Sequence, residues 1–265
     1  MNPPRKACGT FGVLLFWFGS VASAMAQSTN HPVFAARAED AFRQAQMEFR
    51  SGTNDSAAWQ FGRACFDLAD FATNKSERAA IARQGIAACE KLLARVTNSA
   101  PGHYYLAMNF GRLAEAEAPS LAAYHLIRQI EHEFKAAAEL DPAFDYAGPA
   151  RGLGLLYRDA PGWPVSIGSR RKAHEWLVWA VQLAPDYPEN QLNLAESYVK
   201  WHETDRAENS LMTLEALWPN AETRFTGEVW APGWQVWSSR REALRRKLGG
   251  PSAPVAPPRR AADDN

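Results

Sequence analysis

The sequence predicts an all-α fold: a right-handed α-solenoid of antiparallel helix pairs, with lengthened early hairpins and a C-terminal capping helix. The first observation is a set of small and bulky residues that occurs twice, 34 residues apart, as Ala173, Leu177, Ala180 and Pro185 and again as Ala207, Leu211, Leu214 and Pro219. Small side chains at fixed positions let two helices approach closely, and larger neighbours fill the gaps beside them. The second observation is that no stretch alternates apolar and polar residues for long enough to indicate a strand.

Helical periodicity accounts for the first half of the chain. We expect helices over residues 34–50 and 56–72, a third that Ser76 caps, a fourth that Pro101 opens, and a fifth around Ile130, Phe134 and Ala137. The run at 51–55 separates the first two, because it is rich in turn and N-cap residues. Proline suits the first turn of a helix, since its missing N–H has no partner there.

The second half predicts two clearer pairs and a final helix. The pairs are residues 147–159 with 172–183 and residues 188–201 with 205–217, and the last helix covers about 235–248 before Gly249 and Gly250. Gly152 and Gly154 lie inside a predicted helix, so we expect them to allow close helix packing. The aromatic segment 225–232 should fold back over the end of the solenoid, which would otherwise expose its core. We interpret the tryptophans mainly as core residues, with an exposed binding patch as the alternative.

The two ends of the chain differ from this helical body. Residues 1–26 have a short basic start, an apolar run and an Ala-Met-Ala ending, which predicts a secretory signal peptide. Residues 27–249 form the predicted helical-repeat domain, and the Pro-, Ala- and Arg-rich residues 250–265 predict a disordered tail. The protein is therefore expected to be exported, periplasmic or secreted, with no integral membrane segment after cleavage.

Charge and motifs argue against several functional classes. The chain has 29 Lys and Arg against 29 Asp and Glu, a poor basis for binding nucleic acid through its phosphates. It carries none of the common nucleophile, zinc-protease, phosphate-loop or dinucleotide motifs. His125 and His132 lie seven residues apart, which does not favour a metal site over two solvated histidines. We expect no catalytic activity and no cofactor.

Further residues give the chain a resemblance to a known family. Gly154 and Tyr157 precede the first repeated set, and Ala195 and Tyr198 precede the second. With the helix-B spacing and the terminal prolines, this arrangement resembles the tetratricopeptide repeat (TPR) superfamily. The resemblance implies a scaffold for protein or peptide partners.

The link at 160–169 suggests a branch of that superfamily. It is rich in Pro and Gly and precedes a Lys172-Ala173 helix start, as in exported T components associated with tripartite ATP-independent periplasmic (TRAP) transporters. Ile167-Gly168 replaces the Gly-Gly pair of that pattern. This resemblance implies the alternative function, a periplasmic transporter accessory that binds or channels a small, partly hydrophobic ligand.

The TPR resemblance also points to candidate binding residues. In such arrays the concave groove is lined by helix-A residues outside the packing set. Mapped onto this chain, these are Tyr104, Met108, Arg112, Arg151, Leu155, Arg158, Asn193, Glu196 and Lys200. Their mixture suits a peptide or carboxylate better than a wholly apolar ligand, and an ordinary solvated helix face is the alternative.

The mature chain keeps two cysteines, Cys65 and Cys89. Each lies among apolar residues at helical spacing on neighbouring predicted helices, so we expect both to be buried and close together. An oxidising compartment allows a disulfide between them. The predicted offset along the helices is large for such a bond, so buried free thiols remain the alternative.

Overall fold

The computed structural model describes residues 31–52 and 54–249. Over these residues the protein has ten α-helices, one short 3₁₀ helix and no strand. In chain order they are α2 (His31–Ser51), α3 (Ser56–Ala69), α4 (Lys75–Leu93), α5 (Ala100–Glu117), α6 (Leu121–Leu140), α7 (Phe144–Asp159), α8 (Arg170–Leu183), α9 (Pro188–Lys200), α10 (Thr204–Arg224), η1 (Glu228–Trp230) and α11 (Ala231–Lys247). The predicted signal peptide and tail lie outside the described residues.

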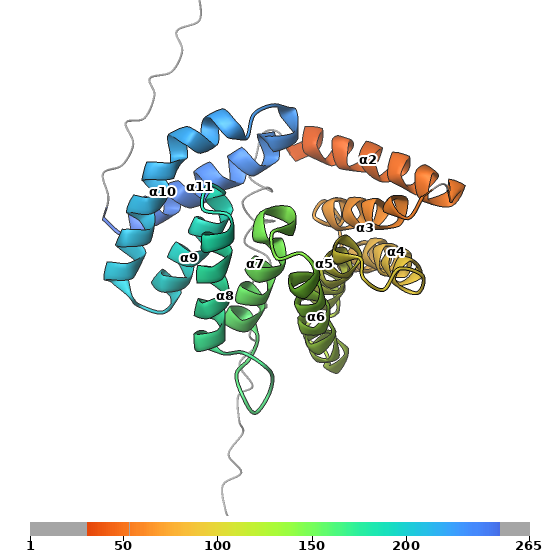
Figure 1. The fold of residues 1–265 in the computed structure, drawn as a ribbon, viewed down its shortest axis with the longest axis horizontal. Coiled ribbons are helices and arrows are strands. Elements are labelled where there is room, and N and C mark those ends of the chain that lie inside the picture. The colour runs from red at the N-terminus through yellow and green to blue at the C-terminus, as the bar shows by residue number, and fades with distance from the viewer. Residues whose placement is uncertain (1–30, 53, 250–265) are drawn as a thin grey trace, which may run out of the picture.

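Consecutive helices form four antiparallel pairs, α3–α4, α5–α6, α7–α8 and α9–α10. The first helix of each pair also contacts the first helix of the next, and α9 contacts α11. We call α3, α5, α7, α9 and α11 the first helices. Figure 1 shows the array curving until the turn between α10 and α11 lies near the start of α2, and Arg37 of α2 forms a 2.9 Å ion pair with Glu228 of η1. The predicted all-α solenoid is confirmed.

Close packing relies on small residues at the pair contacts. A Cβ added to Gly152 would lie 2.5 Å from the ring of Phe134, and one added to Gly154 would lie 2.6 Å from Leu177. These glycines therefore let α7 approach α6 and α8, as their place inside a helix predicted. Ala173 and Ala180, from the first repeated set, have no exposed surface.

Several boundaries differ from the prediction. Asn74, not Ser76, caps α4, because its side chain accepts a 2.9 Å hydrogen bond from the Glu77 N–H. Helix α10 continues past Pro219 to Arg224, although proline removes a helical hydrogen bond. Ala221 and Phe225 are buried in the C-terminal core, so packing there outweighs the local cost.

The aromatic segment after α10 belongs to the core at the end of the array. Phe225 and Trp237 are 2% exposed and pack with Tyr187, whose ring is 5.3 Å from that of Trp237. Of the described tryptophans, only Trp163 stands almost fully in solvent, at 88% exposed. The interpretation of the tryptophans as core residues therefore holds for the C-terminal cluster. None of the described helices is long and apolar enough to cross a bilayer.

Candidate functional site

A left-handed turn opens α7. Asp145, Tyr146 and Ala147 have φ values of 50°, 54° and 63°. Three successive residues with side chains in this region are unusual, because each costs roughly 1–2 kcal/mol. The surrounding structure must supply contacts that hold the turn.

The residues after the turn explain where the regular helix begins. Pro149 suits the first helical turn but disfavours helical geometry in the residue before it. Gly148 occupies that position, and a Cβ there would lie 2.7 Å from the Tyr104 hydroxyl oxygen. Glycine therefore lets the turn lie directly against α5.

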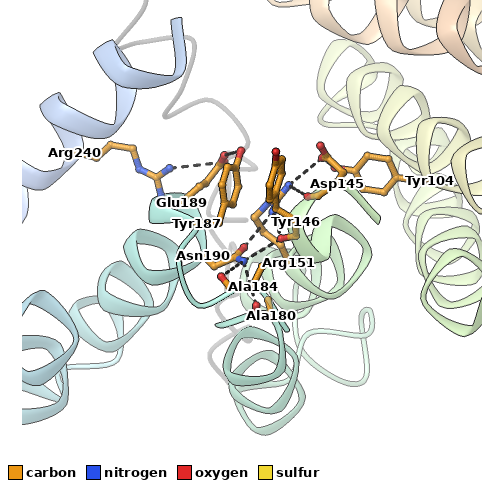
Figure 2. Close-up of polar contacts among 10 residues, drawn as sticks. All are labelled: Tyr104, Asp145, Tyr146, Arg151, Ala180, Ala184, Tyr187, Glu189, Asn190 and Arg240. Atoms are coloured by element: carbon orange, nitrogen blue, oxygen red, sulfur yellow. Dashed lines mark hydrogen bonds and ion pairs between the residues drawn. The ribbon is translucent and has the colours of Figure 1, made fainter. Parts of the chain in front are cut away.

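Side chains from three helices hold the turn by hydrogen bonds (Figure 2). The Tyr104 hydroxyl donates to Asp145 Oδ2 at 2.7 Å, and Arg151 Nη2 donates to the same oxygen at 3.1 Å. The carbonyl oxygen of Tyr146 accepts from Arg151 Nη1 at 3.1 Å and from Asn190 Nδ2 at 3.0 Å. We call Tyr104, Asp145, Tyr146, Arg151 and Asn190 the Asp145 network.

Asn190 connects the Asp145 network to α8. Arg151 Nη1 also donates to Asn190 Oδ1 at 3.0 Å, and Asn190 Nδ2 reaches the carbonyl oxygens of Ala180 and Ala184 at 3.1 and 3.3 Å. The network therefore ties α5, α7, α8 and α9 together at one point.

Burial and charge shift the titration of the network. Burial by itself would lower the pKa of Arg151, but Tyr104, Glu189, Tyr187 and Asp145 together raise it. Burial raises the pKa of Tyr104 well above its usual value, and the Asp145 carboxylate raises it further. Arg151 stays a cation and Tyr104 a neutral donor at physiological pH.

Aromatic rings extend the site from the turn. The Tyr146 ring stacks on Tyr187 with 4.6 Å between centroids, and Phe225 meets Tyr146 edge-on at 5.4 Å. Figure 2 shows the side-chain oxygens of Tyr146, Tyr187 and Asp145 on the side of the network opposite Ala180 and Ala184. A pocket of about 200 Å³ adjoins these rings, lined in part by Tyr146, Tyr187 and Phe225. It has the size of one side chain.

A second polar cluster joins α11 to α9. Arg240 donates to both carboxylate oxygens of Glu196, at 2.8 and 2.7 Å, and also to Asn193 Oδ1. Glu189 lies 3.9 Å from the same guanidinium and accepts a 3.3 Å hydrogen bond from the Tyr187 hydroxyl. We call Glu189, Asn193, Glu196 and Arg240 the Arg240 cluster. These bonds fix the capping helix α11 against α9.

A third cluster lies between α3 and α5. Arg112 forms ion pairs with Asp70 and Glu115, and its guanidinium carbon lies 4.3 Å from the Phe66 ring centroid. We call Asp70, Arg112 and Glu115 the Arg112 triad. Burial raises the pKa of Asp70 and of Glu115, and Arg112 opposes that shift in both.

Asp67 lies one turn before the Arg112 triad on α3. Its side chain is half exposed and its carboxylate lies 3.6 Å from Arg63. Desolvation by the surrounding helices, together with the carboxylates of Asp70 and Asp145, raises the pKa of Asp67 to about 6. Asp67 therefore titrates close to the pH at which proteins work.

The structure places five of the nine predicted groove residues in these clusters. Four are buried, namely Tyr104, Arg112, Arg151 and Asn193; Met108, Leu155, Arg158 and Glu196 are partly buried, and Lys200 is exposed. The four buried residues belong to polar networks, and each of them binds a partner on a neighbouring helix or at its end. The partly buried and exposed residues keep the predicted place on the first helices.

Arg158 and Lys200 meet at a carboxylate that the sequence analysis did not single out. Both bind Asp159, at 2.7 Å each, and Arg158 also donates to Ser197 Oγ at 3.2 Å. Asp159 and Ser197 thus join α7 to α9. Met108 and Leu155 pack against core clusters.

Sequence reasoning missed Asp145, Asn190, Glu189, Tyr187 and Arg240. Asp145 and Tyr187 lie just outside the predicted helices, and Arg240 lies in a helix assigned only a capping role. The one available indication was Gly148-Pro149 close to a predicted helix start, since that pair marks irregular backbone.

Cys65 and Cys89 are both free thiols with no exposed surface. A Cβ at Gly62 would lie 2.4 Å from Cys89 Sγ, so glycine makes the space for that thiol. Burial raises the pKa of Cys65, and it raises the pKa of Cys89 to about 12. Neither thiol is a reactive nucleophile in this state. Within the described residues no three His, Cys, Asp or Glu side chains are placed to hold a metal ion.

Comparison with solved structures identifies the fold. A thermophilic TPR protein from Thermus thermophilus superimposes with a TM-score of 0.59 at 17% sequence identity, over 85% of this chain and 98% of that one. The protein has a TPR-like fold. Yeast Tom70 also matches, with a TM-score of 0.31 and 10% identity over 84% of this chain and 62% of that one.

Sequence comparison relates the N-terminal part to one family. The model of the family described as Regulator of microtubule dynamics protein 1-3 matches residues 29–147, less than half of the chain. This segment ends at Ala147, the last residue of the left-handed turn. No curated protein sequence matches the chain.

Proposed function

We propose that the protein is an exported, non-catalytic TPR-like scaffold that binds a segment of a partner protein along the side formed by its first helices. TPR-like folds are typical of proteins that bind other proteins. Support for the location comes from the three polar clusters, which all lie between first helices. Their hydrogen bonds hold the Tyr146 backbone carbonyl and the Tyr187 hydroxyl in fixed positions, which lowers the entropy cost of binding.

One observation carries the choice of partner chemistry: three arginines of these clusters are buried, whereas three carboxylates near them are accessible. The side chains of Arg112, Arg151 and Arg240 are 7, 8 and 11% exposed. Those of Asp67, Asp145 and Glu189 are 50, 33 and 28% exposed. The arginines already have acceptors within the protein, so the groups left for a partner are mainly acceptors.

The scaffold therefore suits a basic segment, whose Lys or Arg side chains would meet Asp67, Asp145 and Glu189. Arg63, beside Asp67, is an exposed cation on this side. The sequence favoured a peptide or a carboxylate as ligand, and we now choose a basic peptide segment, because three arginines that would bind a carboxylate are already paired.

Affinity isolation with cross-linking tests the proposal. The bait is the full mature chain in a periplasmic extract, compared with Asp67→Lys/Glu189→Lys. We expect cross-links from the first helices to Lys- or Arg-rich partner segments, lost in this variant. The matched control is Glu139→Lys/Glu208→Lys, which makes the same charge change at exposed sites on α6 and α10. Cross-links confined to α4, α6, α8 and α10 would contradict the proposal.

Export is tested separately by N-terminal sequencing of the protein from a periplasmic fraction. A mature chain starting at or near Gln27 is expected, since the Ala-Met-Ala sequence precedes that residue. Recovery of the chain only from the cytoplasm, with Met1 intact, would contradict export.

The alternative function is that of a TRAP-type transporter accessory. Its support is the Pro- and Gly-rich link at 160–169 before Lys172-Ala173. Native mass spectrometry of the gently purified protein distinguishes the two functions. A bound small molecule together with a co-purifying solute-binding subunit favours the accessory, whereas a protein partner alone favours the scaffold.

A further inference from the structure

The loop that joins α7 to α8 presents an apolar tip to solvent. Trp163 is 88% exposed, the highest value among the large apolar side chains described, and Val165 is 67% exposed. Figure 1 shows this loop projecting beyond the ends of α7 and α8. Trp163 and Val165 together form an exposed apolar tip on one loop, and exposed apolar patches mark sites of interaction.

Backbone hydrogen bonds fix the loop in this position. The Gly168 N–H donates to the Pro161 carbonyl at 2.8 Å, and the Ser169 N–H donates to the Tyr157 carbonyl at 2.9 Å. A Cβ at Gly168 would lie 2.0 Å from the Ala160 carbonyl oxygen, so this crossing requires glycine. The hydrogen-bonded backbone of the loop therefore holds Trp163 in its exposed position.

Basic residues surround the base of the tip. Arg170, Arg171 and Lys172 begin α8, and no acidic residue occurs between Asp159 and Glu175. Cations are unfavourable at a helix N-terminus, where the backbone dipole is positive, so these three are not explained by helix stability.

The ion pairs of the two arginines do not neutralise this region. Arg170 pairs with Glu203 and is 55% exposed, and Arg171 pairs with Glu175 and is 74% exposed. The pair of Arg171 with Glu175 is exposed on both sides, and such pairs are weak. Glu203 is 21% exposed, and the Arg170 guanidinium carbon also lies 5.4 Å from the Trp201 ring centroid. Arg171 is therefore available to a negatively charged surface, and Arg170 keeps about half of its side chain in solvent beside it.

We propose that the 160–169 loop docks the protein on an anionic lipid surface. Trp163 and Val165 enter the boundary between headgroups and acyl chains, where tryptophan is favoured. Arg170 and Arg171 bind lipid phosphates beside the N-terminus of α8, which adds unpaired N–H groups and a positive dipole. The loop lies on a different part of the molecule from the Asp145 network, so docking leaves that site free.

Vesicle co-sedimentation tests the proposal with the full mature chain. The probes are vesicles of phosphatidylglycerol mixed with phosphatidylethanolamine, compared with vesicles of phosphatidylcholine alone. We expect sedimentation with the anionic vesicles, weaker at high salt, and little with the neutral ones. Trp163→Ala should weaken binding about tenfold through lost aromatic burial. Each of Arg170→Gln and Arg171→Gln should weaken it about fivefold.

Val229→Ala is the matched control, because Val229 is 75% exposed but lies in η1. It should bind as the unaltered protein does. Failure of the unaltered protein to sediment with anionic vesicles would overturn the proposal, as would equal binding by Trp163→Ala. Equal binding to neutral vesicles would overturn the role of the arginines. Capture of a protein through Trp163, without vesicle binding, would assign the loop to a protein pocket instead.

Discussion

Two buried arginines on neighbouring first helices are neutralised in different ways. Arg151 on α7 donates to backbone carbonyls, to the Asn190 amide and to one carboxylate, Asp145. Arg112 on α5 faces two carboxylates, Asp70 and Glu115, and within the described residues its Nε atom has no hydrogen-bond partner. The first arginine thus depends mainly on acceptors that do not titrate, whereas both ion-pair partners of the second are titratable carboxylates.

The difference teaches how the same side chain serves two roles. Around Arg151 the fixed carbonyl dipoles hold an unfavourable turn, so the arginine mainly stabilises backbone geometry. Around Arg112 the raised pKa values of Asp70 and Glu115 make the charge balance depend on pH. Four measurements distinguish these roles, from the largest expected effect to the smallest.

Replacing Arg151 should cost the most. Arg151→Met removes the donor to the carbonyl oxygens of Asp145 and Tyr146 and leaves a left-handed turn without its main support. We expect the free energy of unfolding to fall by about 3–5 kcal/mol, with little dependence on pH, as urea denaturation would measure. Arg171→Met, at an exposed position, is the control and should change it by less than about 0.5 kcal/mol. A loss below about 1 kcal/mol would contradict the role of Arg151 in holding the left-handed turn.

Replacing Arg112 should give a loss that depends on pH. Arg112→Met leaves Asp70 and Glu115 buried without their cation, so their pKa values rise further in the folded state. A carboxyl whose folded pKa is raised binds more protons folded than unfolded, so stability falls as pH rises through that interval. We expect urea denaturation to show a loss of about 3 kcal/mol at pH 8 and a smaller one at pH 5. Equal losses at the two pH values would contradict the titrating role.

Glycines beside the two arginines should respond in opposite directions to alanine. Gly148→Ala places a Cβ against the Tyr104 ring, whose nearest atoms lie 2.7–2.8 Å away, and should cost about 1–3 kcal/mol. Gly111, next to Arg112, has nothing within 4 Å of an added Cβ, so Gly111→Ala should stabilise α5 by about 0.5–1 kcal/mol. Thermal unfolding of both variants provides the test. A tolerated Gly148→Ala would show that the turn can relax away from α5.

Asp67 should show the smallest effect. Its folded pKa of about 6 lies above the usual value for aspartate, so its contribution to stability is present below about pH 4 and is lost as pH rises through 6. The difference in unfolding free energy between the unaltered protein and Asp67→Asn should fall by about 1 kcal/mol from pH 4 to pH 7, because solvent screens a half-exposed side chain. An NMR titration of the Asp67 carboxyl carbon with a midpoint near pH 4 would contradict the raised pKa.

The chain by itself determined the helices and their pairing. Alanines and leucines at fixed spacing, together with prolines and glycines at the ends, act within a few residues, so their effect can be read locally. The same local patterns placed Tyr104, Arg112, Arg151 and Asn193 on the first helices. They did not show that these side chains would be buried, because burial depends on the next helix.

Only the tertiary structure decided the left-handed turn, the extension of α10 past Pro219 and the partner that each buried charged side chain finds. Tyr104 reaches Asp145 across 41 residues, Asn190 reaches Tyr146 across 44, and Arg240 reaches Asn193 across 47. Each contact supports a conformation or a buried charge that local propensity disfavours. The reason is that helix propensity is decided within one or two turns, whereas buried polar groups find their partners only after distant helices have packed.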